Sequence, residues 1–148
     1  MCIIIDNDVV HRVVIVKDDP DFGALQASLF GVKTPTVRMV YGGTRLAAEY
    51  GGSNTLVRVL RTLDQAGRAR KVPDEAVDAE EQAIAASGLC QSNDHHIIAL
   101  ARVGEVRLLC TGDNALASDF GNSDLIDEPR GKVYRGPAHR HLLVRFCK

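Results

Sequence analysis

The sequence of 148 residues lacks several features that whole classes of protein require. It has no tryptophan and only 5% aromatic residues, so its core has to be built from leucine, isoleucine, valine and alanine. Such a composition suits helices packed on a parallel sheet and makes an all-β fold a poor fit. Neither GxGxxG nor GxxxxGK[ST] occurs. The absence of these phosphate-binding loops disfavours a nicotinamide-dependent enzyme.

Long hydrophobic runs and a strong net charge are also missing. No apolar run approaches the roughly 20 residues that span a bilayer, so we expect no membrane role. The net charge of -1 gives no global basic field, and contact with nucleic acid would need a local patch. The cysteines at Cys2, Cys90, Cys110 and Cys147 form no CxxC pair and follow no secretory signal. We therefore expect a cytoplasmic protein with reduced thiols.

Short apolar runs alternate with segments of helical periodicity along the whole chain. Strands are expected over 2–5, 36–41, 69–72, 106–110 and 132–134. Helices are expected over 8–16, 18–31, 44–50, 53–67, 73–88 and 93–103, a further helix is expected between the last two strands, and an irregular Gly/Asn/Asp/Pro stretch precedes the last strand. This order predicts one α/β domain over 1–148, a three-layer α/β/α sandwich with a mainly parallel central sheet.

Two of the expected strands carry an acid at their downstream end, and a third acid opens a helix. Asp6 follows Ile3–Ile5, Asp113 follows Leu108–Cys110, and Asp94 opens the helix expected over 93–103. Ligands bind at the carboxyl ends of strands in open α/β sheets, so these acids should converge. Each acid alone also suits a helix cap. Together they would repel one another without a cation, which favours Mg²⁺ or Mn²⁺.

The order of these segments resembles the PIN-domain ribonuclease family, which includes VapC-type toxins. Four segments carry the resemblance and together span nearly the whole chain: Ile3–Asp8, Tyr41–Glu49, Ser92–Ala101 and Leu109–Asp113 with Asp119 and Phe120. The third and fourth segments are the most specific. The resemblance implies a PIN-like nuclease domain.

The resemblance also implies a set of site residues. Catalytic and metal-binding roles fall on Asp6, Glu49, Asp94 and Asp113, with Asp119 as a further metal ligand. Thr111 and Asp8 are supporting residues, although Asp8 stands where a small uncharged polar residue is expected. The second acidic role also has rival candidates: Asp64, Asp78, Glu80 and Glu81. Glu49 is preferred because it ends a short helix directly after a strand and a glycine pair.

The activity implied is metal-dependent endoribonucleolytic hydrolysis of phosphodiesters in single-stranded RNA, in a toxin, a defence nuclease or an RNA-processing enzyme. The implied protein partners are an antitoxin or defence-system protein and a second copy of the chain. Two basic patches would hold RNA: Arg58, Arg61, Arg68, Arg70 and Lys71, and a C-terminal stretch from Arg130 to Lys148. From the second patch we select Arg135, Arg140 and Arg145 as RNA-binding residues.

Other functions stay open at this point. His95 and His96, or His139 and His141 with Cys147, suggest zinc, but the tightly spaced ligand pairs of structural zinc sites are missing. A PIN-fold module that binds without catalysis is a second alternative. A receiver-like phosphoacceptor domain that binds Mg²⁺ is a third, with Asp6 and Asp8 as its acid pair. Its phosphoacceptor would be Asp74, in an unfavourable Val-Pro-Asp turn.

Overall fold

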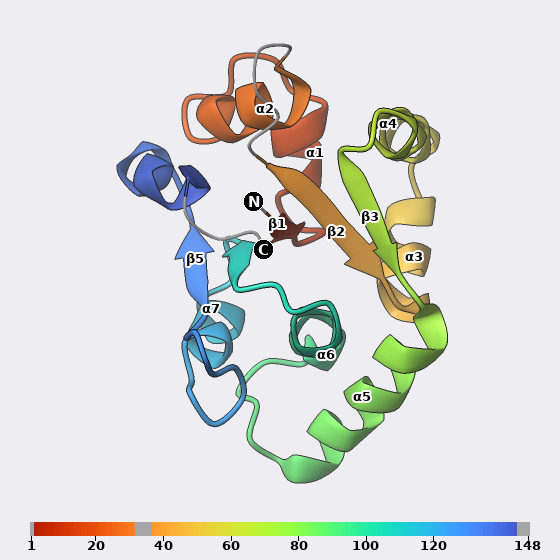
Figure 1. Cartoon of the computed structure of the whole chain (residues 1–148), viewed down its shortest axis with the longest axis vertical. Helices are drawn as coiled ribbons and strands as arrows, with labels where there is room; N and C mark the ends of the chain where they lie inside the picture. The colour runs from red at the N-terminus through yellow and green to blue at the C-terminus, as the bar shows by residue number, and fades with distance from the viewer. Residues whose placement is uncertain (1, 32–36, 145–148) are drawn as a thin grey trace.

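The computed structural model describes residues 2–31 and 37–144 and is built around a five-stranded parallel sheet (Figure 1). The strands are β1 (Cys2–Ile5), β2 (Arg38–Gly42), β3 (Ala69–Val72), β4 (Leu108–Cys110) and β5 (Lys132–Tyr134). Their order across the sheet is β3-β2-β1-β4-β5. The first strand of the chain is therefore the central strand, and both neighbouring strands come later in the sequence.

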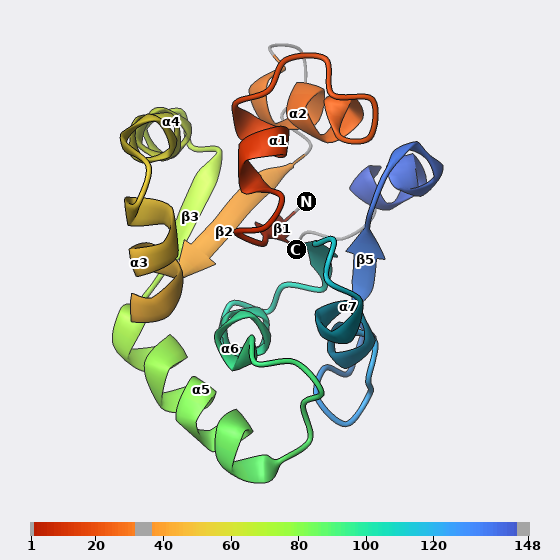
Figure 2. The same cartoon turned by 180° about the vertical axis from the view of Figure 1, so that it is seen from behind.

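Helices connect the strands. They are α1 (Val10–Val14), α2 (Gly23–Phe30), α3 (Thr44–Gly51), α4 (Asn54–Gln65), α5 (Asp74–Ser87), α6 (His95–Val103) and α7 (Asn114–Phe120), and a 3₁₀ segment, η1 (Pro137–Val144), follows β5. In the two opposite views, α1 and α2 lie above the sheet and α6 and α7 below it (Figures 1 and 2). The predicted three-layer α/β/α fold with a parallel central sheet is confirmed.

The central position of β1 follows from its sequence. Ile3, Ile4 and Ile5 are fully buried, because both faces of the strand lie under helices. Ile4 pairs with Leu109 of β4 and Ile3 pairs with Met39 of β2. An unbroken run of β-branched residues is the pattern of a strand buried on both faces. The acid that follows this strand is thereby fixed at the middle of the carboxyl edge of the sheet.

Several predicted boundaries need correction. Helix α6 begins at His95, because the Ser92 hydroxyl accepts the backbone N–H of Asp94 at 3.3 Å and forms a turn before the helix. Strand β4 begins at Leu108, two residues after the predicted start. Helix α7 follows Asp113 directly, at the place where this acid suits a helix cap. The Asp113 carboxylate caps it by accepting the N–H of Leu116 at 3.0 Å.

The cysteines correct one further expectation. Cys2 is disulfide-bonded, so the prediction of a reduced thiol at this position is wrong. Cys90 and Cys110 are free thiols, and Cys110 is buried in β4. Over 2–31 and 37–144, no helix is both long enough and apolar enough to cross a membrane.

Candidate metal centre

Asp6 is a buried acid at the carboxyl end of the central strand. Its backbone N–H donates to the Cys110 carbonyl at 2.9 Å, and the Thr111 hydroxyl donates to its Oδ2 at 2.8 Å. Burial above all, together with the charges of Asp8 and Asp94, raises the pKa of Asp6 to about 7, against the lowering effect of the Thr111 hydrogen bond. The carboxylates of Asp6, Asp8 and Asp94 therefore lie close enough for their charges to repel one another.

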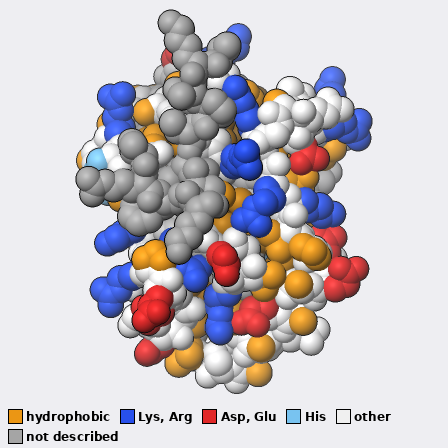
Figure 3. Space-filling view, viewed as in Figure 1, with side chains coloured by type: hydrophobic (Ala, Val, Ile, Leu, Met, Phe, Trp, Pro, Cys, Tyr) orange, Lys and Arg blue, Asp and Glu red, His pale blue; other side chains and the backbone are white. Residues whose placement is uncertain are grey.

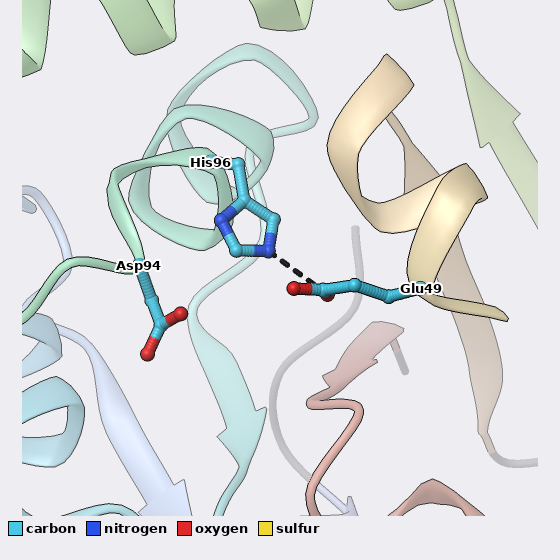
Figure 4. A group of neighbouring side chains, drawn as sticks. All are labelled: Glu49, Asp94 and His96. Carbon is cyan, nitrogen blue, oxygen red and sulfur yellow. Dashed lines mark hydrogen bonds and ion pairs between the residues drawn. The ribbon is translucent and has the colours of Figure 1, made fainter.

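Glu49, Asp94 and His96 form a close group at the same edge. Glu49 reaches from α3, whereas Asp94 and His96 lie at the start of α6 (Figure 4). One potential ligand atom from each of the three lies within 4.8 Å of the others. His96 Nε2 lies 3.2 Å from Glu49 Oε2, and burial raises the pKa of Glu49 above its ordinary value. Two carboxylates and one imidazole are thus placed for a shared cation.

The His96 ring is neutral and leaves one nitrogen without a partner. Its side chain is 1% exposed, and burial together with the nearby Arg45 charge lowers the pKa of His96 to about 4. The neutral ring carries one N–H, which we assign to Nε2 because that atom faces the Glu49 carboxylate. The buried Nδ1, on the side of the ring away from Glu49 in Figure 4, then presents a lone pair with no hydrogen-bond partner.

Arg45 lies among the acids of this edge. Its guanidinium nitrogens are 3.9 Å from Glu49 Oε1, 3.7 Å from Glu81 Oε1 and 3.9 Å from Asp94 Oδ1. Nη1 also donates to the Asn93 carbonyl at 2.9 Å. One cation of the chain therefore offsets part of the charge of three carboxylates.

The turn before α3 fixes the position of the helix that carries Arg45 and Glu49. Gly43 has a φ of 90°, and an added Cβ there would lie 2.7 Å from Val77 Cγ1. Two acids of α5 hold the turn: Asp74 accepts the Gly43 N–H at 3.0 Å and Asp78 accepts the Thr44 N–H at 2.9 Å. The N-terminus of α3 is thus capped by a different helix, which ties the site to α5.

Tyr50 ties the other end of α3 to the central strand. Its buried hydroxyl donates to the Ile5 carbonyl, the backbone group directly before Asp6. Burial raises the pKa of Tyr50 well above its ordinary value, and the charges of Asp6 and Glu49 add to this effect. The neutral phenol therefore links the Asp6 side of the edge to the Glu49 side.

Two predicted metal ligands are engaged elsewhere. Asp113 caps α7, as described above, and the buried Asp119 accepts the N–H groups of Gln91 at 2.8 Å and Ser92 at 2.9 Å. Within the described part of the chain, the close group contains neither of these acids nor Asp6. The metal roles of Asp6, Asp113 and Asp119 stay predictions. Asp119 holds the segment between α5 and α6 that leads to Asp94.

We expect Asp119→Asn to destabilise the fold by about 2 kcal/mol, because one of the two backbone N–H groups that the carboxylate accepts would face an amide NH₂ instead of a carboxylate oxygen. Urea unfolding in EDTA measures this loss. Mn²⁺ affinity of the folded variant should stay within about threefold of the unmodified chain. A loss of metal binding without a loss of stability would instead make Asp119 a ligand.

The rivals of Glu49 for the second acidic role lie outside the close group. Asp64 is exposed on α4, and Asp78 is bonded to Thr44. Glu80 pairs with Arg102 at 3.0 Å, and Glu81 contacts Arg45. Within the described residues, Glu49 is the member of this set that shares a potential cation position with Asp94.

The predicted RNA-binding arginines have different surroundings. Arg135 donates from Nη1 to Asn114 Oδ1 at 2.9 Å and from Nη2 to the Asp113 carbonyl at 3.2 Å. It therefore lies beside the end of β4. Arg140 is exposed in η1. Arg145, like Cys147 of the zinc alternative, lies outside the described residues, and His139 Nδ1 is occupied because it accepts the Arg135 N–H at 3.0 Å.

Sequence reasoning missed His96 and Arg45 as members of the site. The sequence suggests His96 only as a zinc ligand, and the burial of its side chain cannot be seen in the sequence. Arg45 and Glu49 are four residues apart, a spacing that places them together on a helix, and this signal was available.

Comparison with known proteins adds no relative. No family model matches the chain, no curated protein matches its sequence, and no solved structure matches its fold.

Proposed function

We propose that this protein is a PIN-like endoribonuclease that hydrolyses phosphodiester bonds of single-stranded RNA with Mg²⁺ or Mn²⁺. One observation carries the proposal: acids from three separate segments gather at the carboxyl edge of a parallel sheet, next to a buried histidine nitrogen without a partner. Glu49 and Asp94 lie within 4.8 Å of His96, and the Asp94 charge reaches Asp6. Binding sites of open α/β sheets lie at this edge.

The residues present fit a divalent cation. Carboxylate oxygens are hard ligands and suit Mg²⁺ and Mn²⁺. Because His96 Nε2 is bonded to Glu49, the histidine supports a carboxylate ligand in the way that outer partners hold metal ligands. The raised pKa values of Asp6 and Glu49 also fit, since a bound cation would stabilise their ionised forms.

The residues of the site would have different roles in hydrolysis. A bound divalent cation would lower the pKa of the attacking water and offset charge on the leaving oxygen. Asp6, oriented by the Thr111 hydroxyl, and Asp94 and Glu49 would hold that cation. His96 keeps the Glu49 carboxylate in place. With a pKa near 4, His96 is uncharged at neutral pH and is not required as the base.

Basic side chains would bring the RNA to this edge. Figure 3 shows the opposite side of the molecule, because α3 with Glu49 faces the viewer in Figure 2, so the Lys and Arg side chains spread over that face lie away from this edge. Arg135 lies next to Asp113 and Asn114 at the end of β4. Phosphate contacts of this kind add affinity without choosing a sequence.

The test is cleavage of labelled single-stranded RNA with Mn²⁺ and with EDTA. We expect cleavage with Mn²⁺ and none with EDTA. Asp94→Asn should lower the rate about a hundredfold or more, because it removes one charged ligand of the cation. Asp64→Asn changes an exposed acid that is not a member of the close group and should leave the rate unchanged. Equal cleavage in EDTA would overturn the proposal.

A non-catalytic binding module is the second candidate, and Arg45 favours it, because the acids already have a cation of the chain beside them. RNA binding without cleavage under all metal conditions would select this candidate. The receiver-like alternative gains no support: β3 is an edge strand, and Asp74 behind it is bonded to Gly43. A toxin or defence setting, a protein partner and a cytoplasmic location stay predictions from the resemblance.

A further inference from the structure

We propose that Arg45 is a resident counter-ion of the metal centre, and that its guanidinium competes with the divalent cation for Glu49 and Asp94. This inference deepens the proposed function, because it rests on these two acids being metal ligands. It assigns to Arg45 a role in setting the metal affinity of the site.

The position of the guanidinium carries the inference. Its nitrogens lie within 4 Å of Glu49 and Asp94, the two carboxylates of the close group, and of Glu81 on α5. A metal ion held by Glu49 and Asp94 would therefore lie next to a full positive charge. The two cations cannot both occupy the space between these carboxylates.

The contacts of Arg45 are those of an exchangeable partner. Its three ion pairs measure 3.7–3.9 Å, whereas Arg102 and Glu80 meet at 3.0 Å on the neighbouring helices. Strong charge-assisted hydrogen bonds are about 2.7–2.9 Å long. Arg45 is thus shared among three acids and makes no close bond with any of them. Its shortest contact is 2.9 Å, to the neutral Asn93 carbonyl.

The side chain also has room to leave. It is 43% exposed, so its guanidinium can move outward into solvent while the helix stays in place. The Arg45 charge acts on both neighbouring groups: it opposes the rise in the pKa of Glu49 that burial causes, and it adds to the fall in the pKa of His96. A cation that replaces Arg45 would supply the same charge compensation at the Glu49 carboxylate.

The test is Mn²⁺ binding by isothermal titration calorimetry at 0.15 M KCl, with Arg45→Met and Arg45→Gln. Both changes remove the charge, and we expect both to tighten Mn²⁺ binding about tenfold or more, since a unit charge about 4 Å away is a strong repulsion even after solvent screening. Arg45→Lys keeps the charge and should stay within about threefold of the unmodified chain.

Arg102→Met is the matched control. Arg102 is also 43% exposed and also pairs with an acid of α5, but it contacts no member of the close group. This variant should bind Mn²⁺ as the unmodified chain does. Thermal unfolding of each variant confirms that the titrated protein is folded.

The results separate the two proposals. If the unmodified chain binds Mn²⁺ and neither Arg45→Met nor Arg45→Gln binds it more tightly, the counter-ion role is wrong and the metal site stands. If Mn²⁺ binds to none of the folded proteins, the metal site itself is wrong, and the counter-ion role falls with it. Equal tightening in Arg102→Met would show a general charge effect and would also overturn the role of Arg45.

Discussion

Asp6→Asn is expected to abolish RNA cleavage, by about a thousandfold or more, and at the same time to stabilise the metal-free fold above neutral pH. The loss of activity follows from removing a buried negative charge from the proposed cation site. The gain in stability follows from the raised pKa of Asp6, because burial and the charges of Asp8 and Asp94 disfavour its ionised form in the fold. The asparagine carbonyl can still accept the Thr111 hydroxyl hydrogen bond.

Two measurements check this result. Single-turnover cleavage with Mn²⁺ gives the loss of rate, and urea unfolding at pH 8 in EDTA gives the free energy of unfolding. Asp64→Asn serves again as the control, because that acid is exposed. A large drop in stability in EDTA, together with lost cleavage, would make Asp6 a structural residue instead.

The second large effect is in the pH dependence of stability without metal, where Asp6 and His96 act in opposite directions. The pKa of Asp6 rises from 3.8 to about 7 on folding, so between these pH values the folded chain holds a proton that the unfolded chain has lost. This contribution makes stability fall as pH rises through the window. Its size is about 4 kcal/mol at most.

His96 gives the opposite slope. Its pKa falls from 6.5 to about 4 on folding, so between these pH values the unfolded chain holds the extra proton. Stability therefore rises with pH through this window, by about 3 kcal/mol. Burial and Arg45 lower this pKa, while Asp94 and Glu81 oppose them. Because the two windows overlap, the two slopes largely cancel in the unmodified chain.

Single variants should expose each slope. In EDTA between pH 4.5 and 7.5, Asp6→Asn should become more stable as pH rises, because the His96 contribution remains. His96→Gln should become less stable over the same range, because the Asp6 contribution remains. Urea unfolding at intervals of one pH unit measures both. Parallel pH profiles for the two variants would contradict this assignment of the titrating groups.

The sequence was sufficient to predict the parts of the site that depend on strand ends. Three adjacent isoleucines followed by an acid predict a buried strand with Asp6 at its end, and β1 is such a strand at the centre of the sheet. The glycine pair before α3 likewise predicted where the helix with Glu49 begins. These features are local, since the residues that decide them are neighbours in the chain.

Other parts of the site depend on contacts between distant segments, which one sequence does not reveal. The sequence predicts a metal role for Asp119 from its place in a motif, but it does not reveal that this carboxylate accepts two N–H groups from the segment before α6. His96 becomes important only because α6 buries it beside Glu49, which is 47 residues away. Whether an acid binds a metal or a backbone N–H is decided by such packing.

The place of β1 at the centre of the sheet also bears on how the chain is synthesised. Residues 2–5 leave the ribosome before both of their partners, β2 at 38–42 and β4 at 108–110. Once β2 and β3 have been made, one edge of β1 can pair, but its other edge stays open until β4 emerges. An open edge on a strand of isoleucines is a site for aggregation. We therefore expect the nascent chain to be most prone to aggregation between the emergence of β3 and that of β4.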